Sequence, residues 1–368
     1  MTEIDDLNNV NRLNYLQLFK KFYASNVQIN VDSIGQREFG VGIDKKINFR
    51  HKSFSTQREF QQFLSNETPR FVSHSVGRFE FPWVQPMEKK TLLSADLIFD
   101  LDSKPEEGHN QAFCHNCVDK TRGDTIKLVE DFLLRDFGLS QSDLLIVFSG
   151  SKGFHVHVRA ASVQQLSSAS RRLLVDYITG HELTVDNLVT KRGIGNRATT
   201  LHGPSESTTG WRAEFLNCAL AYLNNPFELQ KKKENYLKAH LADVVHLLKN
   251  GNWDFFHGSE EVLQLILEKT IQTHGVQVDS PVTFDVHRLI RVPGTLHGDT
   301  GFLAKPLSMA SLSNFDATRD ATVFKGKTKI TLPSSLALKF DNESLELLIG
   351  ENEVPLSLAV LLTCRGMV

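Results

Sequence analysis

The stretch that decides the fold runs from Leu97 to Val158; it begins LIFDLDS and ends VFSGSKGFHVHV. Each end contains an apolar run that finishes in polar residues, which is typical of a central strand of a sheet. Between them, TRGDTIKLVEDFLLRDFGLS predicts a helix that stops at Gly138. This strand–helix–strand order predicts that the ends of the two strands lie side by side.

The rest of the chain fits a mixed α/β fold. Helical spacing is seen at 11–25 and 55–66, with short candidate strands at 37–43, 45–54 and 70–81. From 214 to 275 the pattern is almost wholly helical, which predicts a helical subdomain or insertion, and strands return after it. The fold class is therefore α/β (mixed α+β).

Composition narrows the setting of the protein. The 368 residues are 40% hydrophobic and 23% charged, which is ordinary for a globular chain. No window approaches about 18 consecutive apolar residues, so no transmembrane helix and no membrane partner is expected. The start, MTEIDDLNNV, lacks the basic and apolar runs of a secretory signal, and four scattered cysteines do not form a disulfide framework. We expect an intracellular protein.

Two carboxylates end the first strand. Asp100 and Asp102 are two residues apart, so on a strand both point to the same face. Such close like charges favour a divalent cation between them, and hard oxygen ligands suit Mg²⁺ or Mn²⁺. The alternative is a solvated strand end with no metal. Asp96, four residues earlier, is expected to be structural.

The second strand leads into a small basic loop. Ser149 and the glycines of SGSKG allow close approach to an anion, and Lys152 supplies a charge. His155 and His157 share a face of the next strand, and each is expected to donate a hydrogen bond to phosphate. The spacing excludes a P-loop. An ordinary glycine-rich turn remains the alternative. Further basic clusters are FRHKSF, at 49–54, and RLIRVPGTLHGDTG, at 288–301, and either could be a solvated face.

A possible zinc site lies between the strands. Cys114 and Cys117 form a C-x-x-C half-site with His109 nearby, and no other cysteine is close. A structural zinc with an unassigned fourth ligand is one interpretation. A redox pair or two free thiols are the others.

Taken in order, these segments resemble the catalytic small subunit of the archaeal and eukaryotic replicative DNA primases, and the archaeal type most closely. The resemblance extends from about Arg37 to Lys305. It rests on REFGVGIDKKINFRHKSF, SADLIFDLD, the C-x-x-C motif, VFSGSKGFHVHV and RLIRVPGTLHGDTG. It implies a catalytic "prim" domain over 1–368, with a zinc knuckle at 103–120 and the helical subdomain at 214–275.

The resemblance also implies roles for single residues. Three aspartates would hold the metal ions: Asp100, Asp102 and one in the strand before RLIR, where Asp279 is favoured and Asp285 is the alternative. The residues that would contact nucleotide phosphates are Arg50, Ser149, Lys152, His155, Arg291 and His297. One cysteine expected in DSKPEEGH is absent, which leaves His109, Cys114 and Cys117 as zinc ligands.

The function implied by the resemblance is de novo synthesis of RNA primers on a single-stranded DNA template by two-metal nucleotidyl transfer, for DNA replication. The expected cofactors are Mg²⁺ or Mn²⁺, with structural Zn²⁺. The expected partners are the template, NTPs or dNTPs, and a primase large subunit. The expected location is the cytoplasm or nucleoid of an archaeal cell. The alternatives are a repair-type primase-polymerase that prefers dNTPs, and a non-catalytic nucleic-acid-binding module.

Overall fold

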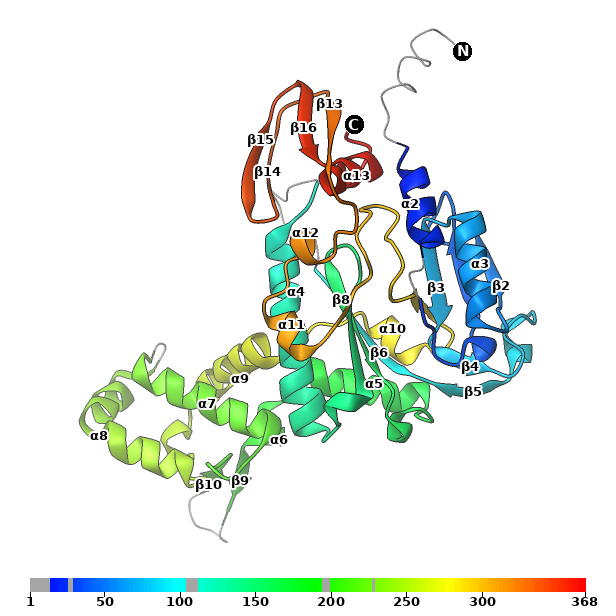
Figure 1. The fold of residues 1–368 in the computed structure, drawn as a ribbon. Helices are drawn as coiled ribbons and strands as arrows, with labels where there is room; N and C mark the ends of the chain where they lie inside the picture. Colours follow the sequence, from blue (N-terminus) through cyan, green and yellow to red (C-terminus); the bar gives the residue numbers. More distant parts are fainter. Residues whose placement is uncertain (1–13, 26–28, 104–111, 194–198, 227–228) are drawn as a thin grey trace. The chain divides into compact units, whose positions relative to one another are not determined.

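The computed structural model describes the chain except for residues 1–13, 26–28, 104–111, 194–198 and 227–228 (Figure 1). The chain folds as two compact units, which are described separately. Unit 1 comprises residues 1–126, 140–172 and 278–368, and unit 2 comprises residues 127–139 and 173–277.

The first sheet of unit 1 contains both halves of the stretch that decides the fold. Its strand order is β12 (Pro306–Leu307), β7 (Leu144–Phe148), β8 (Gly153–Val158) and β6 (Leu97–Asp102), and all neighbours are antiparallel. The predicted strands exist, but they are not direct neighbours. Strand β8 folds back between β6 and β7, because the four-residue loop 149–152 is short enough to form a hairpin, and the carboxyl ends of β6 and β7 lie at the same edge of the sheet with β8 between them.

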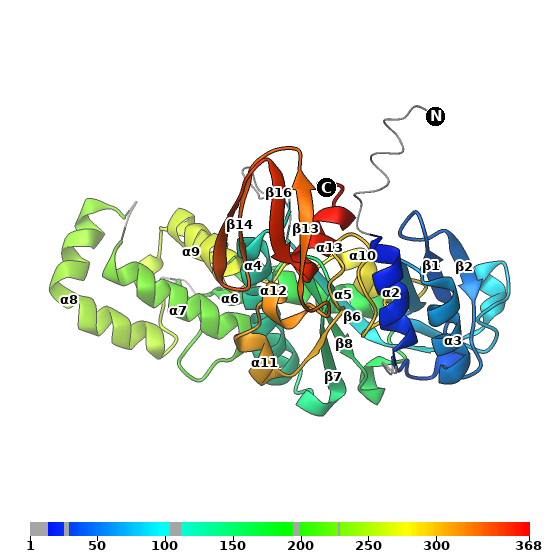
Figure 2. The same cartoon turned by 45° about the horizontal axis from the view of Figure 1, so that its top comes forward.

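The second sheet of unit 1 is built from the N-terminal third of the chain and one distant strand. Its order is β11 (Leu289–Arg291), β3 (Phe71–Ser75), β1 (Phe39–Gly42) and β2 (Phe49–Lys52). Helices α2 (Tyr15–Ala24) and α3 (Gln57–Glu67) lie along this part of the unit (Figure 2). Apolar side chains of the two helices and of β1 share one core, which includes Phe19, Phe39 and Phe60.

The remaining elements of unit 1 are short. The strand pairs are β4 (Gly77–Phe79) with β5 (Leu92–Ala95), β13 (Lys327–Leu332) with β16 (Gly350–Pro355), and β14 (Leu336–Phe340) with β15 (Glu343–Leu347). The helices are α4 (His115–Lys127, whose last residue begins unit 2), α10 (Ser280–Phe284), α11 (Met309–Ser313), α12 (Ala317–Asp320) and α13 (Leu356–Cys364).

The C-terminal helix α13 packs inside unit 1. Its residues Leu358–Leu362 are fully buried, and Figures 1 and 2 show the helix beside β13 and β16. Val360 joins the core formed by α2, α3 and β1. The apolar C-terminal sequence is therefore part of the core of this unit.

Unit 2 is mainly helical. Its helices are α6 (Val185–Leu188), α7 (Gly210–Asn224), α8 (Lys231–Lys249), α9 (Glu260–His274) and most of α5 (Ser168–Thr179). A π-helical stretch at Leu128–Asp136 follows α4 along the chain and also belongs to this unit. Strands β9 (Thr190–Arg192) and β10 (Thr200–His202) form a small hairpin. Leu216, Trp253 and Ile266 lie in its core. The segment 214–275 lies within this unit, which begins earlier in the chain.

The architecture is mixed α/β, and the predicted fold class is confirmed. Across the described residues, no helix combines the length and the apolar character needed to cross a membrane.

Candidate active site

A cavity of about 620 Å³ in unit 1 collects polar side chains from distant parts of the sequence. We call it the carboxylate cavity. The residues that the resemblance assigns to the catalytic metal ions and the nucleotide phosphates all line it, namely Asp100, Asp102, Asp279, Arg50, Ser149, Lys152, His155, Arg291 and His297. The sheet topology thus brings together residues that are separated by up to about 250 positions in the chain.

Strand β6 presents the two predicted carboxylates on one face. Ile98, on the same face, is buried against Val282 and Ile290, whereas Asp100 and Asp102 lie where this apolar cover ends. Across the ladder, Asp100 pairs with His155 and Asp102 pairs with Gly153. A Cβ at Gly153 would collide with the Asp102 carboxylate, so glycine is needed there for the loop to approach the strand end.

The third carboxylate is placed by the backbone. The Asp279 N–H donates a hydrogen bond to the Asp100 carbonyl oxygen at 2.8 Å. Asp279 precedes α10 and is not in a strand, so the predicted strand at this position is wrong; Pro281, in the first turn, favours a helix start. Asp285 lines the same cavity, but only Asp279 acts appreciably on the ionisation of Asp100.

Burial changes the protonation of these carboxyl groups. Burial, together with the negative charge of Asp279, raises the pKa of Asp100 to about 7. The pKa of Asp102 is also raised, by burial and by Asp100. Asp100 Oδ1 is buried without a hydrogen bond from any described residue; His155 Nε2 lies 3.5 Å away. The pair therefore lacks a cationic partner of its own.

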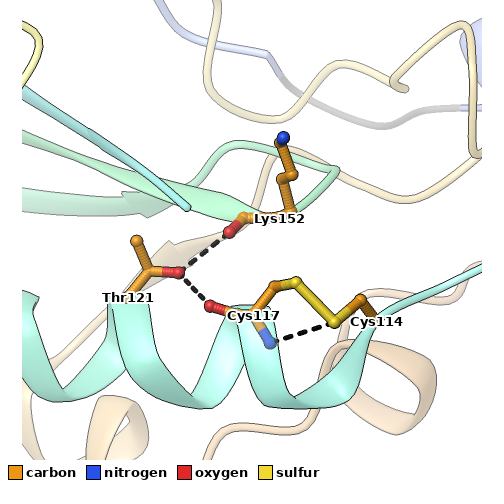
Figure 3. The surroundings of a disulfide bond; sticks show 4 residues. All are labelled: Cys114, Cys117, Thr121 and Lys152. Carbon is orange, nitrogen blue, oxygen red and sulfur yellow. Dashed lines mark hydrogen bonds between the residues drawn. A yellow bond between two sulfur atoms is a disulfide. The ribbon is translucent and has the colours of Figure 1, made fainter. Parts of the chain in front are cut away.

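The loop between β7 and β8 is fixed at both ends. The Ser149 N–H donates to the Gly153 carbonyl at 2.9 Å, and Thr300 Oγ1 donates to the Gly150 carbonyl at 2.5 Å. Gly150 has φ of +87°, and a Cβ there would meet the side chain of His297 at 2.8 Å. The Lys152 carbonyl accepts a hydrogen bond from Thr121 of α4 at 2.9 Å, while the Lys152 side chain extends away from that helix (Figure 3).

The two cavity histidines are neutral donors at neutral pH. Burial, together with the positive charge of Arg291, lowers the pKa of His155 to about 4 and holds that of His297 well below its usual value. His297 Nδ1 accepts a hydrogen bond from the Asp299 N–H at 3.1 Å, which places the ring proton on Nε2. His157 is fully buried outside the cavity, so its predicted access to phosphate is wrong.

Two arginines, Arg50 and Arg291, line the cavity, and they differ in the hydrogen bonds that hold them. Arg50 Nε donates to Glu38 Oε1 at 2.9 Å, and Glu38 is fully buried with Lys90 Nζ 3.5 Å from its other oxygen. Arg291 is half-buried, and its Nη1 has no hydrogen-bond partner among the described residues. Burial lowers the pKa of Arg291 to about 10, so the guanidinium keeps its charge at neutral pH. The sequence analysis did not identify Glu38 as the carboxylate that holds Arg50. The only local signal is that a glutamate stands directly before a candidate strand.

Arg365 is a cavity residue that the sequence did not suggest. It follows α13, and the helix end is held by a Gly366 N–H bond to Thr363 and a Met367 N–H bond to Leu362. Gly366 has the positive φ, +71°, that such a helix end requires. The position of Arg365 in the cavity depends on the burial of α13, and no local motif could have indicated it.

Asp96 serves structure, as expected. It is fully buried, with Arg37 Nη2 2.7 Å from one carboxylate oxygen and Arg78 Nη2 2.9 Å from the other. Asp96 is paired with an arginine on each oxygen and does not line the carboxylate cavity.

The C-x-x-C motif lies at the start of α4, next to the loop between β7 and β8. Cys114 and Cys117 are joined as a disulfide, with their Cα atoms 5.4 Å apart (Figure 3). Thr121, one turn further along, contacts both the Cys117 carbonyl and the Lys152 carbonyl. His109 falls outside the described residues, so the zinc site stays a prediction.

The donor set of the carboxylate cavity suits divalent cations completed by other ligands. Asp100 Oδ1 is buried without a hydrogen bond from any described residue, and Asp102 and Asp279 line the same cavity. Within the described ranges, no three histidine, cysteine, aspartate or glutamate side chains are gathered closely enough to hold a metal alone. Mg²⁺ is commonly held by one or two carboxylates, with substrate phosphates and water as the other ligands. The residues therefore fit such an ion.

Comparison with known proteins agrees with this arrangement. The family model described as "DNA primase small subunit" matches residues 99–309. The DNA primase small subunit PriS of Methanococcoides burtonii is 33% identical over 375 residues, with 95% of each chain covered. That of Methanothrix thermoacetophila is 33% identical over 381 residues, covering 95% of this chain and 96% of the relative.

Among solved structures, the polymerase domain of Mycobacterium tuberculosis ligase D in complex with DNA matches with a TM-score of 0.38 and 14% identity, over 81% of this chain and 83% of that one. A TM-score this low does not establish a shared fold. The sequence relatives do establish the lineage, because they are at least 30% identical over nearly the whole chain. The chain belongs to the archaeal-type DNA primase small-subunit family.

Proposed function

We propose that this protein is the catalytic subunit of a replicative DNA primase. It joins ribonucleoside triphosphates opposite a single-stranded DNA template and extends the product into a short RNA primer. The observation that supports this most strongly is the carboxylate cavity, in which three aspartates face a glycine-rich loop, two neutral histidines and several cations. Family membership supports the same activity.

The carboxylates are proposed to bind the catalytic ions, Mg²⁺ or Mn²⁺. Asp100 and Asp102 project from one strand end, and the bond from the Asp279 N–H to the Asp100 carbonyl keeps the third carboxylate beside them. When bound, such ions lower the pKa of an attacking 3′-hydroxyl and neutralise charge on the leaving pyrophosphate. The chain itself must lose the proton from Asp100, whose pKa is about 7, before this site is complete.

The remaining cavity residues are proposed to hold the triphosphate. Lys152 and Arg291 supply positive charge, while His155 and His297 donate hydrogen bonds without adding charge. Glu38 accepts a hydrogen bond from Arg50 Nε. The bond from Arg50 Nη2 to the His287 carbonyl is long, at 3.3 Å, so the Nη side of the guanidinium is left for an anion. No protein nucleophile is needed in this chemistry.

Partners and further cofactors follow from the family and stay proposals. The template is single-stranded DNA, and a primase large subunit is expected to bind this chain. We also propose that residues 103–120 bind a structural zinc ion through His109, Cys114 and Cys117 when the cysteines are reduced. Primer synthesis for replication takes place at the chromosome, inside the cell.

The test is de novo synthesis by the full chain on a single-stranded template with Mg²⁺ or Mn²⁺, comparing NTPs with dNTPs, with and without a candidate large subunit. We expect primers from NTPs, and none from the variant carrying Asp100→Asn with Asp102→Asn. A matched control is Asp119→Asn, which removes an exposed carboxylate of α4 and should synthesise primers normally.

Two other outcomes would assign a different function. A strong preference for dNTPs with activity on gapped duplexes would indicate a repair-type primase-polymerase. Normal synthesis by the double variant would contradict the proposed site, and binding of DNA without any synthesis would indicate a non-catalytic module.

A further inference from the structure

His157 is a buried side chain of unit 1 to which the proposed function gives no role. The side chain is fully buried and does not line the carboxylate cavity. Neither ring nitrogen, Nδ1 or Nε2, has a hydrogen-bond partner among the described residues. Buried polar groups in proteins nearly always have a partner, from the protein or from an ordered water, because an unsatisfied one is costly. We therefore looked for groups that His157 could reach.

Two other buried histidines lie close to His157. It shares a face of β8 with His155, two residues earlier, and the two ring centres are 6.4 Å apart. The ring centre of His74, on β3, is 6.2 Å from that of His157. These separations are too long for a direct hydrogen bond between ring nitrogens and suit a single bridging water, which commonly joins buried polar groups.

The backbone fixes the tautomer of His74. Its Nδ1 lies 2.9 Å from the Ser75 carbonyl oxygen, which can only accept, so Nδ1 carries the proton. Burial, together with the charge of Arg37, lowers the pKa of His74 to about 3, so the ring is neutral and its Nε2 is an acceptor. A water between His74 Nε2 and His157 must therefore donate to His74.

This direction passes on to His157. Burial, together with the neighbouring histidines and arginines, holds the pKa of His157 well below its usual value, so the ring is neutral and has one donor and one acceptor. The water that donates to His74 can accept from the His157 N–H, which leaves the other His157 nitrogen as an acceptor. A second water can donate one hydrogen to that nitrogen and the other to His155.

The tautomer of His155 matters for the cavity. Its Nδ1 is buried without a hydrogen-bond partner among the described residues, and its Nε2 lies 3.5 Å from Asp100 Oδ1. With the proton on Nε2, His155 can donate a hydrogen bond to anionic oxygens. With the proton on Nδ1, it would instead present a lone pair to them.

We infer that His157 is a positioning residue for nucleotide binding, which keeps the proton of His155 on Nε2 through a buried water between the two rings. His157 itself does not touch the nucleotide. The bond from His74 to the Ser75 carbonyl sets the direction of the hydrogen bonds. The inference rests on the proposed function for phosphate as the ligand of His155, whereas the tautomer does not depend on that function.

The direct test is a long-range proton–nitrogen correlation spectrum of the full chain with isotope-labelled histidine, recorded in EDTA. Nitrogen shifts distinguish the two tautomers of a neutral imidazole, and loss of signals in His155→Gln assigns those of His155. We expect only the Nε2–H tautomer of His155 in the wild type and a mixture of tautomers in His157→Leu. The Nδ1–H tautomer in the wild type, or an unchanged single tautomer in His157→Leu, would overturn the inference.

Kinetics test the consequence for nucleotide binding. His157→Leu should raise the KM for NTP about fivefold, as expected for the weakening of one hydrogen bond, with kcat within about twofold of the wild type. His157→Asn and His157→Gln each restore a donor and an acceptor, and at least one of them should recover the wild-type KM. If neither does, or if kcat falls while KM stays unchanged, the inference is wrong. His157→Phe is the second apolar variant should His157→Leu not fold.

A matched control separates positioning from packing. Val156 is the next residue of β8, is also fully buried and faces the other side of the sheet. Val156→Ala should lower the free energy of unfolding in urea and leave the KM for NTP unchanged. An equal rise in KM in Val156→Ala would overturn the inference, because KM would then follow the stability of the strand. Lack of primer synthesis by the wild type would contradict only the proposed function, because the tautomers are measured without nucleotide.

Discussion

Replacing Asp100 by asparagine should stabilise the metal-free protein while abolishing its activity. The ionised carboxylate of Asp100 is buried beside Asp279, and its pKa is raised from 3.8 to about 7. Because one pKa unit corresponds to about 1.4 kcal/mol, ionising Asp100 in the folded chain costs about 4 kcal/mol relative to the unfolded chain. Asparagine has nearly the same shape and cannot ionise, so it avoids this cost.

The pH dependence gives the sign of the effect. Below the unfolded pKa of 3.8, Asp100 is protonated in both states and contributes no difference. As pH rises towards 7, the unfolded chain loses this proton while the folded chain keeps it, so the wild type loses stability progressively. Asp100→Asn should therefore exceed the wild type in free energy of unfolding by about 1 kcal/mol at pH 4.5 and by about 4 kcal/mol at pH 8.5.

The assay is urea unfolding in EDTA at these two pH values, with Asp119→Asn as a surface control that should match the wild type at both. In excess Mg²⁺ the difference in free energy of unfolding between Asp100→Asn and the wild type should become smaller or change sign. The reason is that Mg²⁺ binding to the folded state stabilises the wild type and not the variant. The reasoning is refuted if Asp100→Asn destabilises the protein at pH 8.5 in EDTA, or if its gain is the same at both pH values.

Three further experiments test other parts of the site. Asp279→Asn should abolish primer synthesis on single-stranded DNA while Asp285→Asn retains most of it; the opposite result would make Asp285 the third ligand. Arg365→Ala should raise the KM for NTP roughly fivefold, equivalent to about 1 kcal/mol for an exposed charge, with kcat unchanged and partial recovery in Arg365→Lys. A fall in kcat alone would contradict phosphate binding by this residue. Zinc content near one ion per reduced chain, lost in Cys114→Ser with Cys117→Ser, is the expected result of metal analysis, whereas zinc-free wild type would exclude the knuckle.

The sequence by itself determined the local chemistry of the site. Two aspartates at spacing two on an apolar strand must share a face, because side chains alternate along a strand. A Ser-Gly-Ser-Lys-Gly turn must allow close approach to an anion, because glycine lacks a Cβ. These local rules sufficed for Asp100, Asp102, Ser149 and Lys152, all of which line the carboxylate cavity.

Only the tertiary structure decided what depends on contacts between distant segments. The insertion of β8 between β6 and β7 is a question of hairpin pairing, which the strand–helix–strand order does not specify. The hydrogen bond from the Asp279 N–H to the Asp100 carbonyl joins β6 to a segment far along the chain, and no local pattern indicates it. Arg365 reaches the cavity because α13 is buried in the core. The protonation of Asp100 and His155 depends on burial, and burial is a property of the packed fold, because it is set by neighbours far away in the sequence.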